Sequence, residues 1–482
     1  MTVTDVDARD RAFFGQPRAL AHLFGVELWE RFSFYGMQGI LLIYLYYTAA
    51  QGGLGIDQGT ATSIVGAYGG SVYLATVVGA WIADRLFGPE RVLFGAAVLV
   101  MIGHIGLAVV PGVAGVAFGL ICIALGSGGV KATATALVGS LYTAGDERRD
   151  AGFSLFYLGI NLGALVGPLL TGLLQKEAGF HWGFGLAAVG MALGLAQYAY
   201  GRKGLTNEVA NPLPRERRPL VIAFAVAVVV VVAALAFTGL IPAARLSTIV
   251  VVLSILAAVA YFAVILSSHR IDATERRRVL AFIPMFLVSA VFWSLYQQQF
   301  TVVTVYSDQR LDRNLFGWEM PVSWVQSINP VFIIILSGVF TVLWTRLGSR
   351  QPSTPIKFGL GTALMGVAFL LFLPLAGGGP NSAPLLGLAG ILFVFTVAEL
   401  LLSPVGLSLA TKLAPEAFRT QMVALFFLSV ALGTAMSGTL ANYYSEDHEV
   451  PYFGILGAIA IVAGLVMVAL TRPLKRLMAG VN

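Results

Sequence analysis

The chain has 482 residues, of which 57% are hydrophobic and only 11% are charged. A soluble protein of this length would need far more polar surface, so the composition excludes one and indicates a polytopic membrane protein. The formal net charge of +6 fits contact with anionic lipid headgroups and not with nucleic acid. The single cysteine, Cys122, excludes an intramolecular disulfide.

Fourteen apolar stretches are long enough to be predicted as transmembrane helices. They lie near residues 19–47, 60–84, 92–110, 113–143, 151–175, 182–201, 219–240, 244–267, 279–307, 321–346, 356–376, 385–411, 418–444 and 452–471. Most Lys and Arg residues lie in the segments that connect these helices on one side of the membrane. The connecting segments on the other side carry only Lys176, Arg245, Arg310 and Arg313. The positive-inside rule therefore predicts that both termini are cytoplasmic. The polar start of the chain shows no signal-peptide pattern, which agrees with this orientation.

The predicted helices form two groups of six, separated by an aliphatic helix pair at residues 219–267. Six plus six is the arrangement of major-facilitator transporters, whose halves surround a midplane site. We therefore predict an all-α polytopic membrane protein with a major-facilitator fold of 6+6 helices plus a two-helix inserted hairpin. The expected segments are an N-terminal segment 1–18, a six-helix bundle 19–201, linkers and hairpin 202–278, a second bundle 279–471 and a tail 472–482.

The loop at residues 79–91, which contains Asp84 and Arg85, resembles the signature between helices two and three of the major facilitator superfamily. In that superfamily the Asp and Arg latch neighbouring helix ends on the cytoplasmic side, and Gly permits a tight turn. The counterpart in the second half, residues 344–348, lacks the Asp, so the internal repeat is faint.

The first predicted helix carries three ionisable side chains on one face, because Glu27, Glu30 and Arg31 stand at positions i, i+3 and i+4. A charge near the bilayer centre costs at least about 2.5 kcal/mol, so it persists only when it is paired or faces a polar cavity. This cluster is suited to binding a proton or an anionic group, and a substrate can compete for Arg31. The alternative is a buried ion-pair network that only locks this helix to the fourth one.

Two further charges, Lys131 and Glu399, lie at membrane depth. Lys131 follows small residues at 126–129, which would let a helix or a ligand approach, although a lysine can also extend to the interface. Glu399 needs a partner or a proton. Neutral polar groups at depth are either site residues or interhelical hydrogen-bonding groups, and they include Asn161, Trp293, Tyr296, Gln297 and Asn329.

Together these residues resemble the proton-dependent oligopeptide transporter (POT) family of the major facilitator superfamily over nearly the whole chain. The most specific matches are the Glu27-x-x-Glu30-Arg31 motif with residues 32–36, the loop at 79–91 and residues 153–164. Bacterial members are also similar in carrying two extra helices between the halves.

The resemblance implies a proton-coupled symporter that imports di- and tripeptides by alternating access. It implies that Arg31 and Lys131 face the peptide carboxylate, and that Glu399 and the two Asn residues face its amino end. The expected proton-coupling residues are Glu27, Glu30, Arg31 and Glu399. The expected substrate-binding residues are Arg31, Tyr35, Gln38, Tyr73, Lys131, Asn161, Trp293, Gln297, Asn329, Glu399, Ser403 and Phe426.

The chain departs from the family at several of these positions. Gln38 stands where many members have Arg, and Gln297 where many have an acid, a pair proposed to form a salt bridge on the outer side of the site. Both charges are absent together, which leaves room for an amide–amide hydrogen bond that does not respond to pH. Phe34 and Phe426 replace a common Tyr and a common Trp, so side-chain selectivity is expected to differ.

The hypothesis is that protonation of Glu27 and Glu30 releases Arg31 for the peptide carboxylate. Two alternatives remain open: a transporter of another small anion or peptide-like drug, and a non-transporting peptide sensor. An enzyme is not expected, because the five His are scattered and no catalytic or metal-ligand set is present. We expect no metal and no cofactor, peptides and protons as co-substrates, a sufficient monomer, and the bacterial cytoplasmic (inner) membrane.

Overall fold

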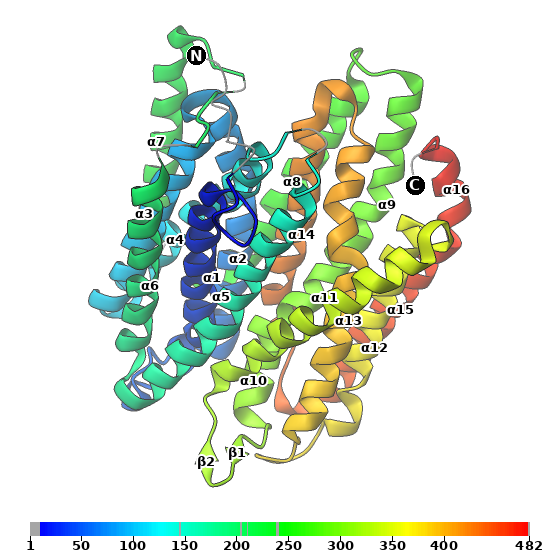
Figure 1. The fold of residues 1–482 in the computed structure, drawn as a ribbon. Helices are drawn as coiled ribbons and strands as arrows, with labels where there is room; N and C mark the ends of the chain where they lie inside the picture. The colour runs from blue at the N-terminus through cyan, green and yellow to red at the C-terminus, as the bar shows by residue number, and fades with distance from the viewer. Residues whose placement is uncertain (1–9, 144–145, 203–204, 210, 238–240, 481–482) are drawn as a thin grey trace. The chain divides into compact units, whose positions relative to one another are not determined.

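The computed structural model describes residues 10–143, 146–202, 205–209, 211–237 and 241–480. Nearly all regular structure in these residues is helical (Figure 1). The one strand pair among them joins β1 (Asn314–Leu315) to β2 (Trp318–Glu319) in antiparallel register. The predicted all-α class is confirmed.

Long apolar helices account for all the predicted transmembrane stretches. Twelve helical segments of the described residues are long and apolar enough to cross a membrane. Two further helices, α1 (Arg18–Tyr46) and α7 (Arg218–Phe237), are not among the twelve. Each of the fourteen predicted stretches coincides with one of these segments, with ends that differ by a few residues. Residues 238–240 of the predicted helix at 219–240 lie outside the described residues.

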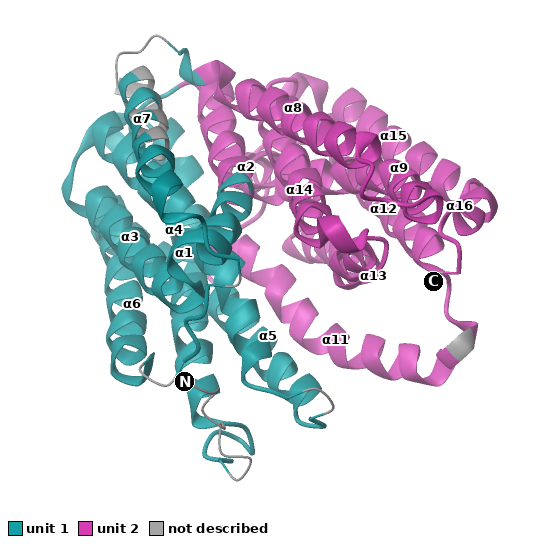
Figure 2. Cartoon of the chain, turned by 90° about the horizontal axis from the view of Figure 1, so that it is seen from above, with its two compact units in different colours: residues 1–56, 74–243 teal, residues 57–73, 244–482 magenta. Residues whose placement is uncertain are grey.

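The chain divides into two compact units, coloured separately in Figure 2. Unit 1 comprises residues 1–56 and 74–243, and unit 2 comprises residues 57–73 and 244–482. The helix α2 (Gln58–Ile82) is thus divided between the units, and a second division falls inside the predicted hairpin. The five segments expected from the sequence stay a prediction.

Unit 1 is a bundle of long helices held together at small residues. A Cβ atom on Gly167 would lie 3.0 Å from the backbone nitrogen of Gly36, so its helix contacts the backbone of α1. Thr171 adds a 2.8 Å hydrogen bond to the carbonyl oxygen of Gly36. This close packing fixes the direction in which the polar face of α1 points. The unit contains α1, the end of α2, α3 (Pro89–Val109), α4 (Gly112–Ser140), α5 (Arg149–Ala178), α6 (Phe180–Gly201) and α7.

The segment at residues 79–91, predicted as a loop, is largely helical, since α2 continues into a π-helical stretch, η2 (Ala83–Phe87), and α3 begins at Pro89. It contacts the linker that follows α6. The backbone N–H groups of Asn211 and Leu213 donate to the carbonyl oxygens of Asp84 and Arg85, each at 2.9 Å. Within the described residues the Asp84 side chain forms no ion pair, and the expected Asp latch stays a prediction. Gly88 has a φ of +80°, which an L side chain rarely adopts, as the predicted tight turn requires.

Unit 2 is a second helical bundle with an aromatic core. The rings of Phe372 and Phe453 stack with centroids 4.4 Å apart. The unit contains the start of α2 with α8 (Leu246–Ser267), α9 (Ala273–Tyr296), α10 (Val302–Gln309), α11 (Ile328–Leu347), α12 (Thr354–Leu370), α13 (Leu385–Lys412), α14 (Arg419–Ala441), α15 (Glu449–Ala469) and α16 (Thr471–Leu477).

The helix predicted at residues 279–307 is interrupted. Between α9 and α10 lie a 3₁₀ turn, η6 (Gln297–Phe300), and Thr301, whose φ and ψ are −122° and −96°. The predicted span is confirmed as one helical segment long and apolar enough to cross a membrane, Ala273–Gln309, but its helix is irregular at these residues. Gln298 is fully buried and accepts a 2.7 Å hydrogen bond from Tyr452.

Candidate functional site

A buried cluster of one guanidinium and two carboxylates lies on α1 in unit 1. Nε of Arg31 is 2.7 Å from Oε1 of Glu27 and 3.1 Å from Oε2 of Glu30. The exposed fractions of Glu27, Glu30 and Arg31 are 2%, 0% and 2%. The spacing of the three residues along one helix places them together, as predicted. Two carboxylates against one guanidinium leave the group with an excess of negative charge when both are ionised.

The helix α4 supplies two further polar groups to this cluster. The hydroxyl of Ser127 donates a 2.6 Å hydrogen bond to Oε1 of Glu30. One turn later, Nζ of Lys131 lies 5.2 Å from the ring centroid of Phe34, and Cζ of Arg31 lies 5.8 Å from the same centroid. Ser127 was missed by the sequence reasoning, although it lies four residues before Lys131 and therefore on the same helix face.

The small residues before Lys131 accommodate neighbouring helices. A Cβ on Gly126 would lie 2.6 Å from the carbonyl oxygen of Ala96 on α3, and one on Gly128 would lie 2.6 Å from the carbonyl carbon of Ala75 on α2. Approach of neighbouring helices at this stretch is therefore observed, and approach of a ligand stays a prediction.

One nitrogen of the Arg31 guanidinium makes no hydrogen bond within the described residues. Its Nη1 is buried and has no hydrogen-bond partner among them, and the same holds for Oε2 of Glu27. A buried donor without an acceptor carries the full cost of its desolvation. A guanidinium in this state is suited to an incoming carboxylate, which accepts two parallel N–H groups.

The other expected residues of unit 1 lie on α1 and α5. The side-chain amide of Asn161 donates to the carbonyl oxygen of Tyr157 at 2.9 Å, so this donor bonds within its own helix. Tyr35 is half-buried, with its ring 5.2 Å from that of Phe34. Gln38 is buried, and its Oε1 has no hydrogen-bond partner in the described part of the chain.

Unit 2 contains a second polar cluster around Glu399 on α13. Tyr296 on α9 donates a 2.7 Å hydrogen bond to Oε2 of Glu399. Asn329 on α11 lies 3.4 Å from the same oxygen, and its amide also donates to the hydroxyl of Thr396 at 3.0 Å. Two helices, α9 and α11, therefore direct neutral donors at one carboxylate of a third helix. Tyr296 was noted from the sequence as a polar group at membrane depth but not among the expected substrate-binding residues, and Thr396 was not singled out.

The remaining expected residues of unit 2 are aromatic or neutral. The ring of Trp293 is 5.2 Å from that of Tyr296, and its buried Nε1 has no hydrogen-bond partner in the described chain. Gln297 is buried in η6 and therefore belongs to unit 2, whereas Gln38 belongs to unit 1. The expected hydrogen bond between these two amides stays a prediction. The last three expected residues of this unit are Tyr73 on α2, Ser403 on α13 and Phe426 on α14.

A buried ion pair that the sequence reasoning missed lies at one end of unit 2. Nε of Arg310 is 3.1 Å from Oε1 of Glu449, which also accepts from the hydroxyl of Tyr444 at 3.0 Å. The backbone N–H of Gly377 donates to the other carboxylate oxygen at 2.7 Å. Both charges fall in segments that hydropathy predicts as loops, so no sequence signal marked them as buried.

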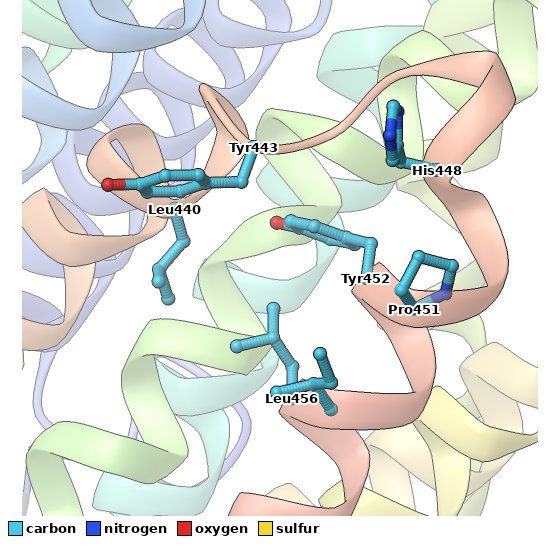
Figure 3. Close-up of a pocket in the computed structure, with 7 residues that line it drawn as sticks. Leu440, Tyr443, His448, Pro451, Tyr452 and Leu456 are labelled. Atoms are coloured by element: carbon cyan, nitrogen blue, oxygen red, sulfur yellow. The ribbon is translucent and has the colours of Figure 1, made fainter.

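A cavity of about 290 Å³ lies apart from all the expected site residues (Figure 3). It is mainly apolar and is formed by the end of α14 and the start of α15. Its lining residues are Leu440, Tyr443, His448, Pro451, Tyr452, Ile455 and Leu456.

Long membrane helices with charged clusters buried inside two helical units define a polytopic membrane transporter. A family model described as the POT family matches residues 90–462, and the chain belongs to this family. The family assignment, the major-facilitator fold and the expectation that the protein is not an enzyme are thereby confirmed.

Individual relatives are similar over almost their full lengths. The Di-/tripeptide transporter of Lactococcus lactis subsp. cremoris is 40% identical over 99% of this chain and 100% of its own. The "Uncharacterized transporter YclF" of Bacillus subtilis (strain 168) is 42% identical over 98% of this chain and 97% of its own. A crystal structure of peptide transporter POT in complex with sulfate has a TM-score of 0.93 at 42% identity, covering 98% of this chain and 99% of that one.

Proposed function

We propose that this protein imports di- and tripeptides together with protons by alternating access. Its 40% identity to a di-/tripeptide transporter over nearly the whole chain supports peptides as the substrate class. The observation that carries the proposal is the buried Arg31, held by Glu27 and Glu30 through Nε while its Nη1 has no hydrogen-bond partner in the described chain.

In this proposal the unit 1 cluster binds the peptide carboxylate. Arg31 and Lys131 supply two cations, and Tyr35, Gln38 and Asn161 supply neutral polar groups. One solved relative is described as being in complex with sulfate, which is an anion. Protonation of Glu27 and Glu30 then weakens their hold on Arg31 and favours binding of the peptide carboxylate.

The unit 2 cluster is proposed to bind the amino end of the peptide. Glu399 offers a carboxylate, and Asn329 offers an amide oxygen beside it. Trp293 and Phe426 are proposed as apolar walls, with Tyr73, Gln297 and Ser403 as further contacts. A cationic group at one end and an anionic group at the other suit a short zwitterion.

The proposed location is the bacterial cytoplasmic membrane, with both termini in the cytoplasm. Inward movement of each net positive charge would then gain about 2.3 kcal/mol per 100 mV of membrane potential. Protons and peptides are the proposed co-substrates, and one chain carries both clusters, so a monomer is sufficient.

The test is uptake of labelled dialanine into proteoliposomes with an inward proton gradient, before and after an uncoupler collapses it. We expect accumulation that the uncoupler abolishes. A Glu27→Gln/Glu30→Gln variant should lose accumulation but retain peptide counterflow. The matched control is Glu90→Gln, which removes another buried carboxylate of unit 1, paired with Arg202 at 2.7 Å. Accumulation that persists in the double variant would refute the coupling mechanism.

The second candidate function is transport of another small anion or a peptide-like drug, or peptide sensing without transport. The neutral residues Gln38 and Gln297 favour it, since many family members carry a charged pair there. Failure of dialanine to compete with the transported compound would support an altered substrate. Peptide binding without accumulation would support a sensor.

A further inference from the structure

The second helix of the predicted hairpin, α8, has one face of small and hydroxyl-bearing side chains. Its buried residues are Ser247, Val250, Ser254, Ala258 and Ile265. The rest of the helix is mostly aliphatic and largely exposed, as expected for a surface in contact with lipid. Two fully buried serines in such a helix need hydrogen-bond partners, and the two find different ones.

Ser247 joins three helices of unit 2 through a network of hydroxyl groups. Its Oγ lies 3.0 Å from Oγ of Ser63 on α2 and accepts from the hydroxyl of Thr439 on α14 at 3.0 Å. Ser63 in turn donates to the carbonyl oxygen of Ala244 at 3.0 Å. In contrast, Ser254 donates only to the carbonyl oxygen of Val250 in its own helix, at 2.8 Å.

Glycines bring α2 against α14 next to this network. A Cβ on Gly66 would lie 2.6 Å from the Cα of Gly438, and one on Gly70 would lie 2.9 Å from Cγ1 of Val250 on α8. The remainder of α2 packs against α4 in unit 1, where a Cβ on Gly79 would lie 2.8 Å from the Cα of Gly129. One continuous helix is therefore packed tightly within both units.

We propose that Ser247 is a positioning residue for transport, and that α8 acts through it as a latch on the first half of α2. This inference rests on the proposed alternating-access function, in which the two halves of the protein change their mutual arrangement. A helix that packs against α14 of the second bundle and against α4 of the first must then release one set of contacts in each cycle. Hydrogen bonds between hydroxyls can break and re-form. In the latched state the first half of α2 is hydrogen-bonded to α8 through Ser247, and in the released state these bonds are broken. The hairpin therefore biases the equilibrium between the two states.

The experiment measures exposure of a reporter cysteine beside the latch in purified full-length protein. The background carries Cys122→Ser, and the reporter is Gln309→Cys. Gln309 is half-buried and donates to the side chain of Gln58 on α2 at 3.2 Å. A water-soluble maleimide should label it faster when the start of α2 leaves its position. The measurement requires neither peptide nor a proton gradient.

Loss of one hydroxyl from the network should raise the labelling rate about threefold. We expect this for Ser247→Ala and Ser63→Ala, with no further gain in the double variant because both serines act in one network. Ser247→Thr should retain the native rate, and Ser254→Ala is the matched control on the same helix. Initial uptake rates should show a changed maximal rate with little change in KM.

Equal labelling of the Ser247→Ala and Ser254→Ala variants would overturn the latch. If Ser247→Ala does not fold, Ser63→Ala and Thr439→Val test the same network from the other two helices. Absence of dialanine uptake by the native protein would refute the proposed function while the labelling result still decides for or against the latch.

Discussion

Ser127 on α4 donates a 2.6 Å hydrogen bond to Oε1 of Glu30 on α1. The same carboxylate lies 3.1 Å from Nε of Arg31, so a neutral donor and a cation share one buried anion. Glu30 is therefore a carboxylate of the unit 1 cluster that a neighbouring helix contacts directly.

Replacing Ser127 with Ala should move the pH profile of proton-driven uptake upward by about half a unit to one unit. The hydroxyl stabilises the ionised carboxylate, so its loss favours the protonated form at a given pH. Uptake of labelled dialanine at a series of external pH values measures the shift. The control is Ser33→Ala, because Ser33 donates to the backbone oxygen of Glu30 at 2.9 Å and not to its carboxylate. A downward shift, or the same shift in both variants, would contradict the assignment.

Replacing Tyr296 with Phe should raise the KM for dialanine about tenfold. The ring is retained, but Glu399 loses its 2.7 Å hydrogen bond and with it a defined orientation toward the peptide amino group. A hydrogen bond to a charged group is worth about 1.5–3 kcal/mol. Tyr306→Phe serves as the control, since this buried tyrosine of the same span donates to the backbone oxygen of Leu375 at 3.1 Å. Equal KM values for the native protein and the Tyr296 variant would argue against a substrate role for Glu399.

Replacing Arg31 with Met should destabilise the protein by about 3–5 kcal/mol, because two buried carboxylates then lose their cation. Adding Glu27→Gln and Glu30→Gln to the same variant should restore most of the stability without restoring uptake. Thermal unfolding in detergent, followed by tryptophan fluorescence, measures the stability. An Arg31→Met variant that unfolds at the native temperature would show that the two carboxylates are neutral in the folded protein.

Stability should fall at alkaline pH partly because of Tyr444. Burial, followed by the neighbouring Glu449 carboxylate, raises the pKa of the Tyr444 phenol above its ordinary value of about 10. In the unfolded chain this phenol ionises near pH 10 while the folded state keeps its proton, so the free energy of unfolding decreases as the pH rises above about 10. Its share is at most about 1.4 kcal/mol per pH unit.

Denaturant unfolding between pH 9 and 11 tests this dependence. Tyr444→Phe should reduce the slope of stability against pH. Tyr443→Phe is the adjacent control, because that side chain is 73% exposed. An unchanged slope in the Tyr444 variant would show that its ionisation is not linked to unfolding.

Local patterns were sufficient for much of the architecture. Apolar stretches of bilayer length marked each long helix, because hydropathy depends only on neighbouring residues. The spacing of Glu27, Glu30 and Arg31 predicted their contact, since all three lie within about one turn of a single helix. Motifs in order along the chain were enough to recognise the family. Burial of Arg310 and Glu449 was not predictable in this way, because both lie in segments that hydropathy assigns to loops.

The sequence by itself therefore determined the class of protein, its helices and the chemistry of the α1 cluster. Only the tertiary structure decided which residues of other helices complete each cluster: Ser127 at Glu30, Tyr296 at Glu399, and Ser247 between Ser63 and Thr439. Ser127 is 97 residues from Glu30 in the chain, and Tyr296 is 103 residues from Glu399. Ser247 is 184 residues from Ser63 and 192 residues from Thr439. Their contacts depend on how helices rotate and pack against one another. That rotation is set by close approach at small residues such as Gly167 and Gly438, and not by the local period of the sequence.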